Sequence, residues 1–438
     1  MAANDKELRA EILRLVKEFH DLRFAPQPFV PGKDPVRYAG RVFDEREMQS
    51  LVDSALDFWL TAGRFTEQFE AGLAEYVGTE YAFLVNSGSS ANLLALASLT
   101  SPLLGEKRLK PGDEVISVAA GFPTTVNPIL QHGMVPVFVD VELGTYNVDP
   151  RALREAIGPK TRAIFLAHTL GNPYDLDVVM ELVKKHDLWL IEDCCDALGS
   201  TWRGRKVGTF GHLSTCSFYP AHHITLGEGG AVLTGDERIA RAARSIRDWG
   251  RDCYCAGGEN NTCGKRFGGK YGSLPEGYDH KYVYSHIGYN LKATDMQAAI
   301  GVAQLEKLPR FVQARRDNFK AWQAGFQKWQ DQFVLPRALE GADPSWFAFP
   351  LTVKEGAGFT RTALADFLNG KRVETRNLFG GNLLRQPAYS DIAKRVHGSL
   401  ETTDFVMDHT LFLGTYPGLT PEKIAHVLAL VGEFLARH

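Results

Sequence analysis

Short apolar runs alternate with longer amphipathic stretches along the first two thirds of this 438-residue chain. The runs are rich in Val, Ile and Phe, as is typical of strands that are buried on both faces of a parallel sheet. We expect such strands at 82–85, 114–118, 135–141, 162–167, 188–191, 214–218 and 231–233. The amphipathic stretches predict covering helices at 90–99, 150–157 and 176–185. This alternation predicts an α/β domain with a mainly parallel sheet.

The rest of the pattern divides the chain. The first residues predict a charged amphipathic helix with Leu8, Ile12 and Leu15 on one face, and a helical period returns at 294–328. Between them, 251–284 is rich in Gly, Asn, Cys and Lys and has no period, which is uncommon in a compact domain unless the segment is functional. We expect an N-terminal helical extension at 1–35, a large cofactor-binding domain at 36–310 with the inserted Cys-rich loop, and a small C-terminal domain at 311–438.

The composition is ordinary for a globular protein, with 44% apolar and 23% charged residues. A net charge of −3 gives no indication of a nucleic-acid or membrane surface. The N-terminus lacks the features of a signal peptide, and no apolar run has the length of a membrane span. We therefore expect a cytoplasmic protein, in which the six cysteines indicate metal binding, catalysis or coincidence rather than disulfides.

Small or aromatic residues follow two of the predicted strands. In NSGSSANLLALASL, which starts at Asn86, a turn leads into a helix at Ser89 and Ser90. Glycine lets a backbone approach a ligand, and the free N–H groups of a helix start bind phosphate, although a simple serine helix cap explains the motif equally well. Phe122 follows the strand at 114–118, where open α/β sheets place ligands, and there it could stack on a flat ring or belong to the core.

An acidic residue follows another strand directly, in LWLIEDCCDALGS. Burying the Asp193 carboxylate is costly unless it has a partner. A protonated pyridine nitrogen is such a partner, and the pair turns the ring into an electron sink. A helix N-cap and a metal ligand are the alternative interpretations.

The segment STCSFYPAHHITLGEGGAVLTG makes the interpretation specific. Ser217, Phe218 and the glycine-rich 227–230 match a Ser-Phe-x-x-x-Lys-x-x-x-x-Gly-Glu-Gly-Gly signature. The chain thus resembles the sugar-nucleotide aminotransferase and dehydratase family of the aspartate-aminotransferase fold, from about Gly40 to its end. The resemblance implies fold type I of the pyridoxal phosphate enzymes: a large α/β domain with a mainly parallel sheet and a smaller C-terminal α+β domain.

The resemblance also implies a homodimer with its active site at the interface. The cofactor-binding residues that it implies are Gly88, Ser89, Ser90, Phe122, Asp193, Asp196, Ser217, Tyr219 and Asn290. Phe122 would stack on the cofactor ring, Asp193 would pair with its nitrogen, and Asn290 would reach the phosphate of the partner subunit's cofactor. Phe347 and Arg376 could reach the pocket from the C-terminal domain, or be a core aromatic and a surface cation.

The chain departs from the family at His222, which stands where the family has its lysine. A lysine amine binds pyridoxal phosphate covalently, whereas an imidazole forms no stable bond of that kind. The cofactor would then be held non-covalently, as pyridoxamine 5′-phosphate or pyridoxal phosphate. The unperturbed pKa of histidine, about 6.5, suits a general base. A disabled or repurposed homologue is the alternative.

The cysteines indicate the subclass. Cys253, Cys255 and Cys263 lie in RDCYCAGGENNTC, and 57 residues separate Cys195 from Cys253. By themselves these spacings favour neither structural zinc nor an iron–sulfur cluster. Taken together with the histidine in the lysine position, these cysteine spacings resemble those of the C3-deoxygenating branch of the family, the CDP-4-keto-6-deoxy-D-glucose 3-dehydrases. The resemblance places the four ligands of a [2Fe–2S] cluster on Cys195, Cys253, Cys255 and Cys263, and we interpret Cys194 and Cys216 as buried structural thiols.

This branch implies C3 deoxygenation in 3,6-dideoxyhexose biosynthesis, such as that of lipopolysaccharide O-antigen sugars. Pyridoxamine phosphate would condense with the C4 ketone, His222 would start elimination of the C3 hydroxyl, and the cluster would deliver two electrons. The chain has no G-x-G-x-x-G fingerprint that opens a βαβ unit, so an NAD(P)H-dependent flavin iron–sulfur reductase is implied. The alternatives are a cluster-free GDP-sugar 3-dehydratase that recycles its cofactor with glutamate, a non-catalytic sugar- or redox-responsive regulator, and a zinc-stabilised aminotransferase.

Overall fold

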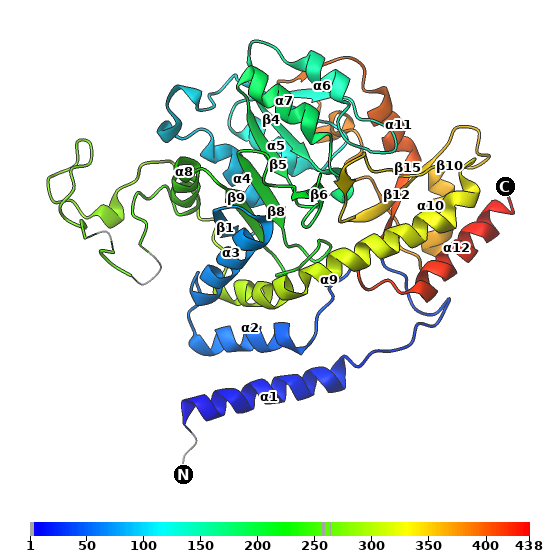
Figure 1. Ribbon diagram of the computed structural model, residues 1–438, viewed down its shortest axis with the longest axis horizontal. Helices are drawn as coiled ribbons and strands as arrows, with labels where there is room; N and C mark the ends of the chain where they lie inside the picture. The colour runs from blue at the N-terminus through cyan, green and yellow to red at the C-terminus, as the bar shows by residue number, and fades with distance from the viewer. Residues whose placement is uncertain (1–3, 256–258, 263) are drawn as a thin grey trace.

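The computed structural model of the protein describes residues 4–255, 259–262 and 264–438. Its centre is an eight-stranded sheet in the order β1-β9-β8-β5-β4-β2-β3-β14 (Figure 1). The strands are β1 (Tyr81–Val85), β2 (Glu114–Val118), β3 (Val135–Val139), β4 (Thr161–Ala167), β5 (Trp189–Asp193), β8 (Leu213–Ser217), β9 (Gly230–Thr234) and β14 (Arg395–Val396). Neighbouring strands from β8 to β14 run parallel, and β9 is antiparallel to both β1 and β8. The predicted mainly parallel sheet and its seven strands are therefore confirmed.

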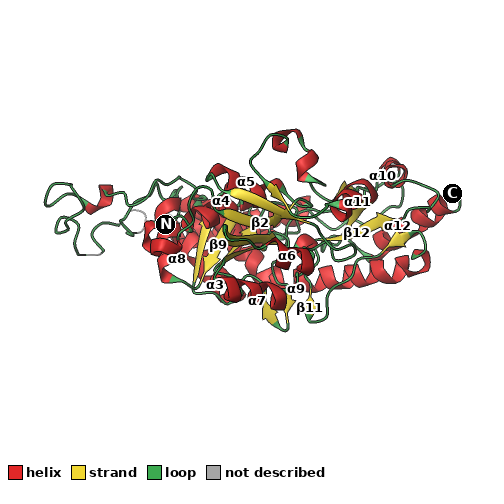
Figure 2. Ribbon diagram, turned by 90° about the horizontal axis from the view of Figure 1, so that it is seen from above, coloured by secondary structure: helices red, strands yellow, loops and turns green. Residues whose placement is uncertain are grey.

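Successive side chains of each strand point to opposite faces of the sheet and pack in two separate cores. On β1, Leu84 packs in the core beneath α3 (Arg64–Val77), α6 (Pro150–Ala156) and α7 (Leu176–His186). Its neighbour Val85 packs in the opposite core with α4 (Gly88–Ser98) and α8 (Glu237–Arg247). Figure 2 shows α4 and α5 (Pro123–Gln131) on one side of the sheet and α3, α6 and α7 on the other. Helices thus cover both faces of the sheet. A ligand can therefore bind at the carboxyl ends of the parallel strands.

The C-terminal part of the chain forms a second, antiparallel sheet in the order β10-β12-β15-β13. These strands are β10 (Phe333–Val334), β12 (Ala348–Val353), β13 (Arg376–Asn377) and β15 (Thr410–Gly414), and the helices of this part are α10 (Arg361–Gly370), α11 (Glu401–His409) and α12 (Pro421–Leu435). A small third sheet contains β6 (Thr201–Trp202), β7 (Arg205–Lys206) and β11 (Ala342–Asp343). The 3-10 helices are η1 (Pro102–Lys107), η2 (Thr169–Gly171), η3 (His280–Tyr282), η4 (Gln327–Trp329), η5 (Leu383–Arg385) and η6 (Pro387–Tyr389).

A long helix, α9 (Asp295–Phe326), connects the two main cores. Leu308 and Phe311 belong to the core of the central sheet, whereas Trp322 and Phe326 belong to that of the C-terminal sheet. The predicted domain boundary at 310 falls inside this helix, and the division of the chain into three regions stays a prediction.

The N-terminal amphipathic helix is present as α1 (Asp5–Arg23), which lies alongside α2 (Glu45–Asp57) and buries none of its residues (Figure 1). Within the described part of the chain, no helix is both long and apolar enough to cross a membrane.

The Cys-rich segment stands out from the body of the molecule in both views (Figures 1 and 2). Among its described residues the only regular element is η3. Its base is anchored by isolated bridges between Asp248 and Asn290 and between Arg251 and Tyr284. The expectation of a segment without helical or strand period is therefore confirmed.

Candidate active site

A cavity of about 620 Å³ opens where β2, β4, β5 and β8 end, a size that suits a small-molecule ligand. Nine of the predicted site residues line it: Gly88, Ser89, Phe122, Asp193, Cys195, Asp196, Ser217, Tyr219 and His222. The other predicted residues within the described chain, Ser90, Asn290, Cys253 and Cys255, are not part of its wall. The fold therefore brings together most of the predicted site from segments that are up to 134 positions apart (Gly88 to His222).

Asp193, the last residue of β5, is the buried acid at the cavity floor. Its side chain accepts hydrogen bonds from the Asn92 amide (2.9 Å), the Thr125 hydroxyl (2.8 Å) and the Cys195 backbone N–H (3.1 Å). All three donors are neutral, and no salt bridge to Asp193 is found among the described residues. A carboxylate that is 5% exposed and held by neutral donors fits a cation in the cavity, such as a pyridinium N–H.

The turn before α4 has the geometry of an anion site. Ser87 caps the helix by accepting from the Ser90 N–H (3.1 Å), and Gly88 packs so closely that a Cβ there would lie 2.4 Å from the Cβ of Ser217. The start of this 11-residue helix lines the cavity with Ser87, Gly88 and Ser89, and helix starts carry free N–H groups that bind anions. Ser90 itself donates its hydroxyl to the Asn86 side chain (2.6 Å), and its predicted phosphate contact stays a prediction.

His222 lies in the cavity wall next to a second acid. Its Nδ1 is 3.3 Å from Oδ1 of Asp196 without the alignment of a hydrogen bond, so the contact is electrostatic. Burial raises the pKa of Asp196, and the nearby imidazole opposes that rise. Phe347 covers the ring, with the two ring centroids 5.3 Å apart. The imidazole thus lies beside a carboxyl group at one nitrogen and against Phe347 on one side, which suits a group that moves a proton.

Arg315 of α9 positions this histidine, and the sequence analysis missed it. Its buried guanidinium donates to the backbone carbonyls of His222 (2.9 Å), Trp346 (3.2 Å) and Phe347 (3.2 Å). Burial lowers the pKa of Arg315 to about 10, opposed by Asp196. An arginine on the apolar face of a long helix was the signal that could have identified it.

The C-terminal part also reaches the cavity. Phe347 and Arg376, for which a core and a surface role were the alternatives, both line the wall. The Arg376 guanidinium lies over the Tyr38 ring, 4.2 Å from its centroid, and is half-exposed. A cation at the cavity mouth is suited to a phosphorylated ligand.

The proposed thiol ligands are divided between two places. Cys195 lines the cavity, whereas Cys253 and Cys255 lie on the Cys-rich segment, and Cys263 lies outside the described residues. Thr262 donates to the Cys255 thiol (3.0 Å) and thereby lowers its pKa. None of the three-residue ligand groups found in the described chain includes these thiols. Cys194 and Cys216 are both buried, as expected for structural thiols.

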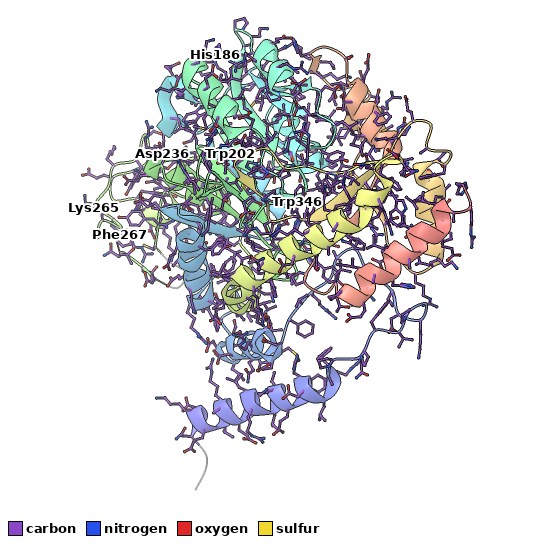
Figure 3. The ribbon with its side chains drawn as sticks, turned by 45° about the vertical axis from the view of Figure 1, so that its right-hand side comes forward. His186, Trp202, Asp236, Lys265, Phe267 and Trp346 are labelled. Carbon is purple, nitrogen blue, oxygen red and sulfur yellow. The ribbon has the colours of Figure 1, made fainter. Side chains whose placement is uncertain are left out.

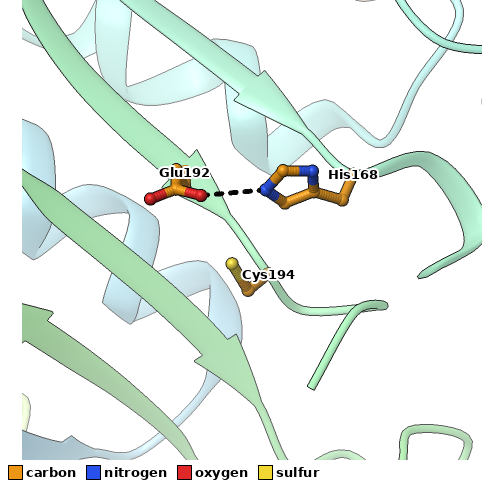
Figure 4. A group of neighbouring side chains, drawn as sticks. All are labelled: His168, Glu192 and Cys194. Carbon is orange, nitrogen blue, oxygen red and sulfur yellow. Dashed lines mark hydrogen bonds and ion pairs between the residues drawn. The ribbon is translucent and has the colours of Figure 1, made fainter. Parts of the chain in front are cut away.

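One such group is fully buried beside the cavity floor: His168, Glu192 and Cys194 (Figure 4). The imidazole Nε2 lies 3.1 Å from the Glu192 carboxylate. The same carboxylate also accepts three backbone N–H groups of the loop before β8, at 2.6–2.9 Å. With its lone pairs occupied in this way, Glu192 anchors that loop rather than a metal ion.

Fold and cavity together define the class of protein: the chain belongs to the DegT/DnrJ/EryC1/StrS aminotransferase family, which matches residues 42–432. It is 54% identical over 434 residues to the lipopolysaccharide biosynthesis protein RfbH of Salmonella typhimurium, which covers 99% of both chains. It is 52% identical over 431 residues to dTDP-4-dehydro-2,6-dideoxy-D-glucose 3-dehydratase of Saccharopolyspora spinosa, which covers 98% of this chain and 93% of that protein.

Solved structures agree with this assignment. The structure of Escherichia coli GDP-4-keto-6-deoxy-D-mannose-3-dehydratase with bound hydrated pyridoxal phosphate superimposes with a TM-score of 0.81. The two chains are 30% identical, and the match covers 90% of this chain and 98% of the Escherichia coli chain. The predicted family and the aspartate-aminotransferase-like fold are thus confirmed, whereas the roles of the individual site residues stay predictions.

Proposed function

We propose that this protein is a sugar-nucleotide 3-dehydrase that removes the C3 hydroxyl of a nucleotide-linked 4-keto-6-deoxyhexose. The proposed cofactors are pyridoxamine phosphate and a [2Fe–2S] cluster, and the expected substrate is CDP-4-keto-6-deoxy-D-glucose. The observation that carries the proposal is His222, an imidazole beside Asp196 in the wall of a cavity whose floor retains a buried acid for the cofactor. A family member that keeps the cofactor site without its lysine would use the same cofactor for a different reaction.

The cavity residues fit the cofactor. Asp193 would hold its ring nitrogen, the turn at Gly88 and Ser89 would hold its phosphate together with Ser217, and Phe122 would face its ring. When bound, the cofactor supplies an amine for the C4 ketone and an electron sink for the elimination. The pyridoxal phosphate in the Escherichia coli relative supports this choice.

His222 would be the acid–base group of the elimination. Because Nδ1 of His222 lies beside Asp196, Nε2 is the nitrogen that would exchange a proton with the substrate. Nε2 would take the proton that starts the elimination and return it to the departing C3 hydroxyl, which leaves as water. Phe347 and the buried guanidinium of Arg315 would keep the imidazole in place during both transfers.

The second half of the reaction needs electrons. Replacing C–OH by CH₂ at C3 consumes two electrons and two protons, and a [2Fe–2S] cluster passes electrons singly. Cys195, Cys253 and Cys255 would hold the cluster, with Cys263 as the fourth ligand. An NAD(P)H-dependent flavin iron–sulfur reductase would refill it. We further propose a homodimer in which Asn290 reaches the phosphate of the partner subunit's cofactor, since the side chain is exposed and outside its own cavity.

The choice of CDP comes from the resemblance described above, whereas two of the relatives carry dTDP- and GDP-sugar names. The substrate assay therefore compares CDP-, dTDP- and GDP-linked 4-keto-6-deoxyhexoses.

The experiment compares the whole protein with a Cys253→Ser variant, both reconstituted anaerobically with iron, sulfide and pyridoxamine phosphate. We expect the unmodified protein to be red-brown, with about two irons per chain, and to deoxygenate C3 when a flavin reductase and NADH are present. The variant should be colourless and should form no deoxygenated product. It should still exchange the C3 oxygen of the substrate with labelled water, because the elimination needs only the cavity.

Two outcomes would contradict the proposal. A colourless, zinc-loaded unmodified protein would indicate a structural metal site. Turnover that requires glutamate but neither iron nor reductase would instead identify a cluster-free dehydratase. The matched control is Cys216→Ser, which changes a buried thiol outside the proposed ligand set and should keep the iron.

A further inference from the structure

Within one chain, the proposed cluster ligands do not share a site. Cys195 lies in the cavity wall between Asp193 and Asp196. Cys253 and Cys255 lie on residues 249–290, which we call the arm. No described residue of the arm lines the cavity, and the arm extends away from the body of the molecule in both ribbon views (Figures 1 and 2).

The base of the arm is held against the body of the molecule. The His286 imidazole forms hydrogen bonds with the hydroxyls of Ser101 (2.7 Å) and Ser245 (2.8 Å). Asp248 and Asn290 form an isolated bridge beside it. Folding the arm back onto its own cavity would break these contacts, so a ligand set within one chain requires a rearrangement.

Seven large apolar or aromatic side chains are exposed among the described residues of the arm. The side chain of Ile287 is fully exposed, at 101% of its reference area. The other large exposed side chains of the arm are Trp249, Tyr254, Phe267, Tyr278, Tyr282 and Tyr284, and Figure 3 labels Phe267 beside Lys265 at the edge of the molecule. Apolar groups gathered on one exposed segment indicate a surface that another molecule covers.

The cavity mouth has a matching character. Phe122 and Tyr219 line it and are 52% and 51% exposed. In a two-fold pair, every chain offers both its arm and its cavity mouth, and each contact therefore forms twice. A second copy of this chain is then the occupant that covers both surfaces at once, and Asn290 at the base of the arm would enter the same cavity.

We infer that the iron–sulfur cluster is assembled between two copies, with Cys195 from one chain and with Cys253 and Cys255 of the partner subunit. This inference rests on the iron–sulfur chemistry proposed above and specifies which chains build each site. Each thiol gives up its proton as it binds iron, and the electrons still come from the external reductase. Cys263 lies outside the described residues, and neither test below depends on it.

The first test uses a heterodimer of a Cys195→Ser chain with a Cys253→Ser chain, isolated through two different affinity tags and reconstituted anaerobically with iron and sulfide. If the ligands come from two chains, one site combines the intact Cys195 of the Cys253→Ser chain with the intact arm of the Cys195→Ser chain. The heterodimer should then recover half of the iron and half of the visible absorbance of the unmodified dimer. Ligands from a single chain would leave both sites broken and the heterodimer colourless.

The second test reverses the expectation. In a heterodimer of an unmodified chain with a Cys195→Ser/Cys253→Ser chain, each shared site loses one ligand, so the cluster should be absent. A single-chain ligand set would instead retain half of it. The matched control is a heterodimer of Cys253→Ser with Cys255→Ser, which should be colourless under either arrangement.

The readouts are iron content, acid-labile sulfide and visible absorbance, none of which needs turnover. A colourless first heterodimer together with a half-loaded second one would overturn the inference while leaving the proposed function in place. An unmodified dimer that binds no iron would overturn both. Size-exclusion chromatography of every preparation ensures that loss of colour is scored only in intact dimers.

Discussion

The cavity wall and the arm differ in how their functional residues are held. In the wall, Asp193 is fixed by three hydrogen bonds and the backbone of His222 by a buried arginine. On the arm, Cys253 and Cys255 lie on a segment whose only regular element, among its described residues, is η3. The acid and the histidine of the wall meet within one chain, whereas the thiols of the arm lie away from the cavity of their own chain.

This difference matches the two halves of the proposed reaction. Moving a proton requires a fixed geometry of a few tenths of an ångström, which strand ends and packed helices supply. Passing single electrons tolerates a longer path, so its ligands can lie on a loop that docks against another chain. The comparison predicts that changes in the wall impair elimination and that changes in the arm impair assembly.

The largest effect is expected at His222. His222→Asn removes the proton acceptor but preserves a polar group in the wall, so elimination should slow about 10²–10⁴-fold. Iron content should not change, because the arm and Cys195 are untouched. Exchange of the C3 oxygen in single-turnover experiments measures the loss, and His397→Asn, on the remote β14 side of the sheet, is the matched control. An unchanged elimination rate would remove His222 from the mechanism.

A smaller effect is expected at the arm. Ile287→Asp places a charge on a side chain that is fully exposed in the single chain, so the fold should remain intact. If a second copy covers this residue, each of the two symmetry-related contacts loses about 1.5–3 kcal/mol of apolar burial, a factor of about 10–150 in dimer affinity per contact. Sedimentation over a dilution series measures this effect. Leu22→Asp, also strongly exposed but on α1, is the matched control, and equal dimer affinities for the two variants would contradict a covered arm.

The smallest effect is expected at Asp196, whose contact with His222 is poorly aligned. Asp196→Asn should slow elimination by about three- to tenfold, or roughly 0.6–1.4 kcal/mol. The matched control is Asp391→Asn, which changes an exposed acid and should leave the elimination rate unchanged.

The same variant makes a prediction about pH. Because burial raises the pKa of Asp196, the folded protein binds this proton more tightly than the unfolded chain. Its contribution to stability is therefore present at low pH and is lost as the pH rises through the folded pKa. Asp196→Asn should raise Tm at neutral pH and should change it little below about pH 3, where the side chain is protonated in both states. A Tm that falls at neutral pH but not below about pH 3 would show that the charged carboxylate is stabilising.

The sequence predicted the elements whose signals are local. Val, Ile and Phe runs identified seven strands of the central sheet, and the glycine-containing turn before α4 and the acid at the end of β5 identified residues that line the cavity. β14 was missed because two residues, Arg395 and Val396, are too few to show a period and pair with β3 from the far end of the chain.

The sequence analysis also missed residues from distant segments that form hydrogen bonds with the predicted site residues. Asn92 and Thr125 lie 101 and 68 positions before Asp193, and nothing in their own motifs points to it. Arg315 lies 93 positions after His222, on a helix whose period indicated only a buried face. The family resemblance supplied the histidine and the cysteines, but it did not indicate that Cys195 and the arm would lie apart within one chain.

The neutral donors around Asp193 have a consequence for the stability and abundance of the protein in a cell. Whenever the cavity holds no cation, Asp193 has only these neutral partners, and burying a carboxyl group without a counter-charge lowers the stability of the folded state. A ligand that binds only the folded chain adds stability in proportion to the logarithm of its concentration. Vitamin B6 supply would therefore set not only the activity of this protein but also its abundance, because the less stable form is the one that proteases remove first.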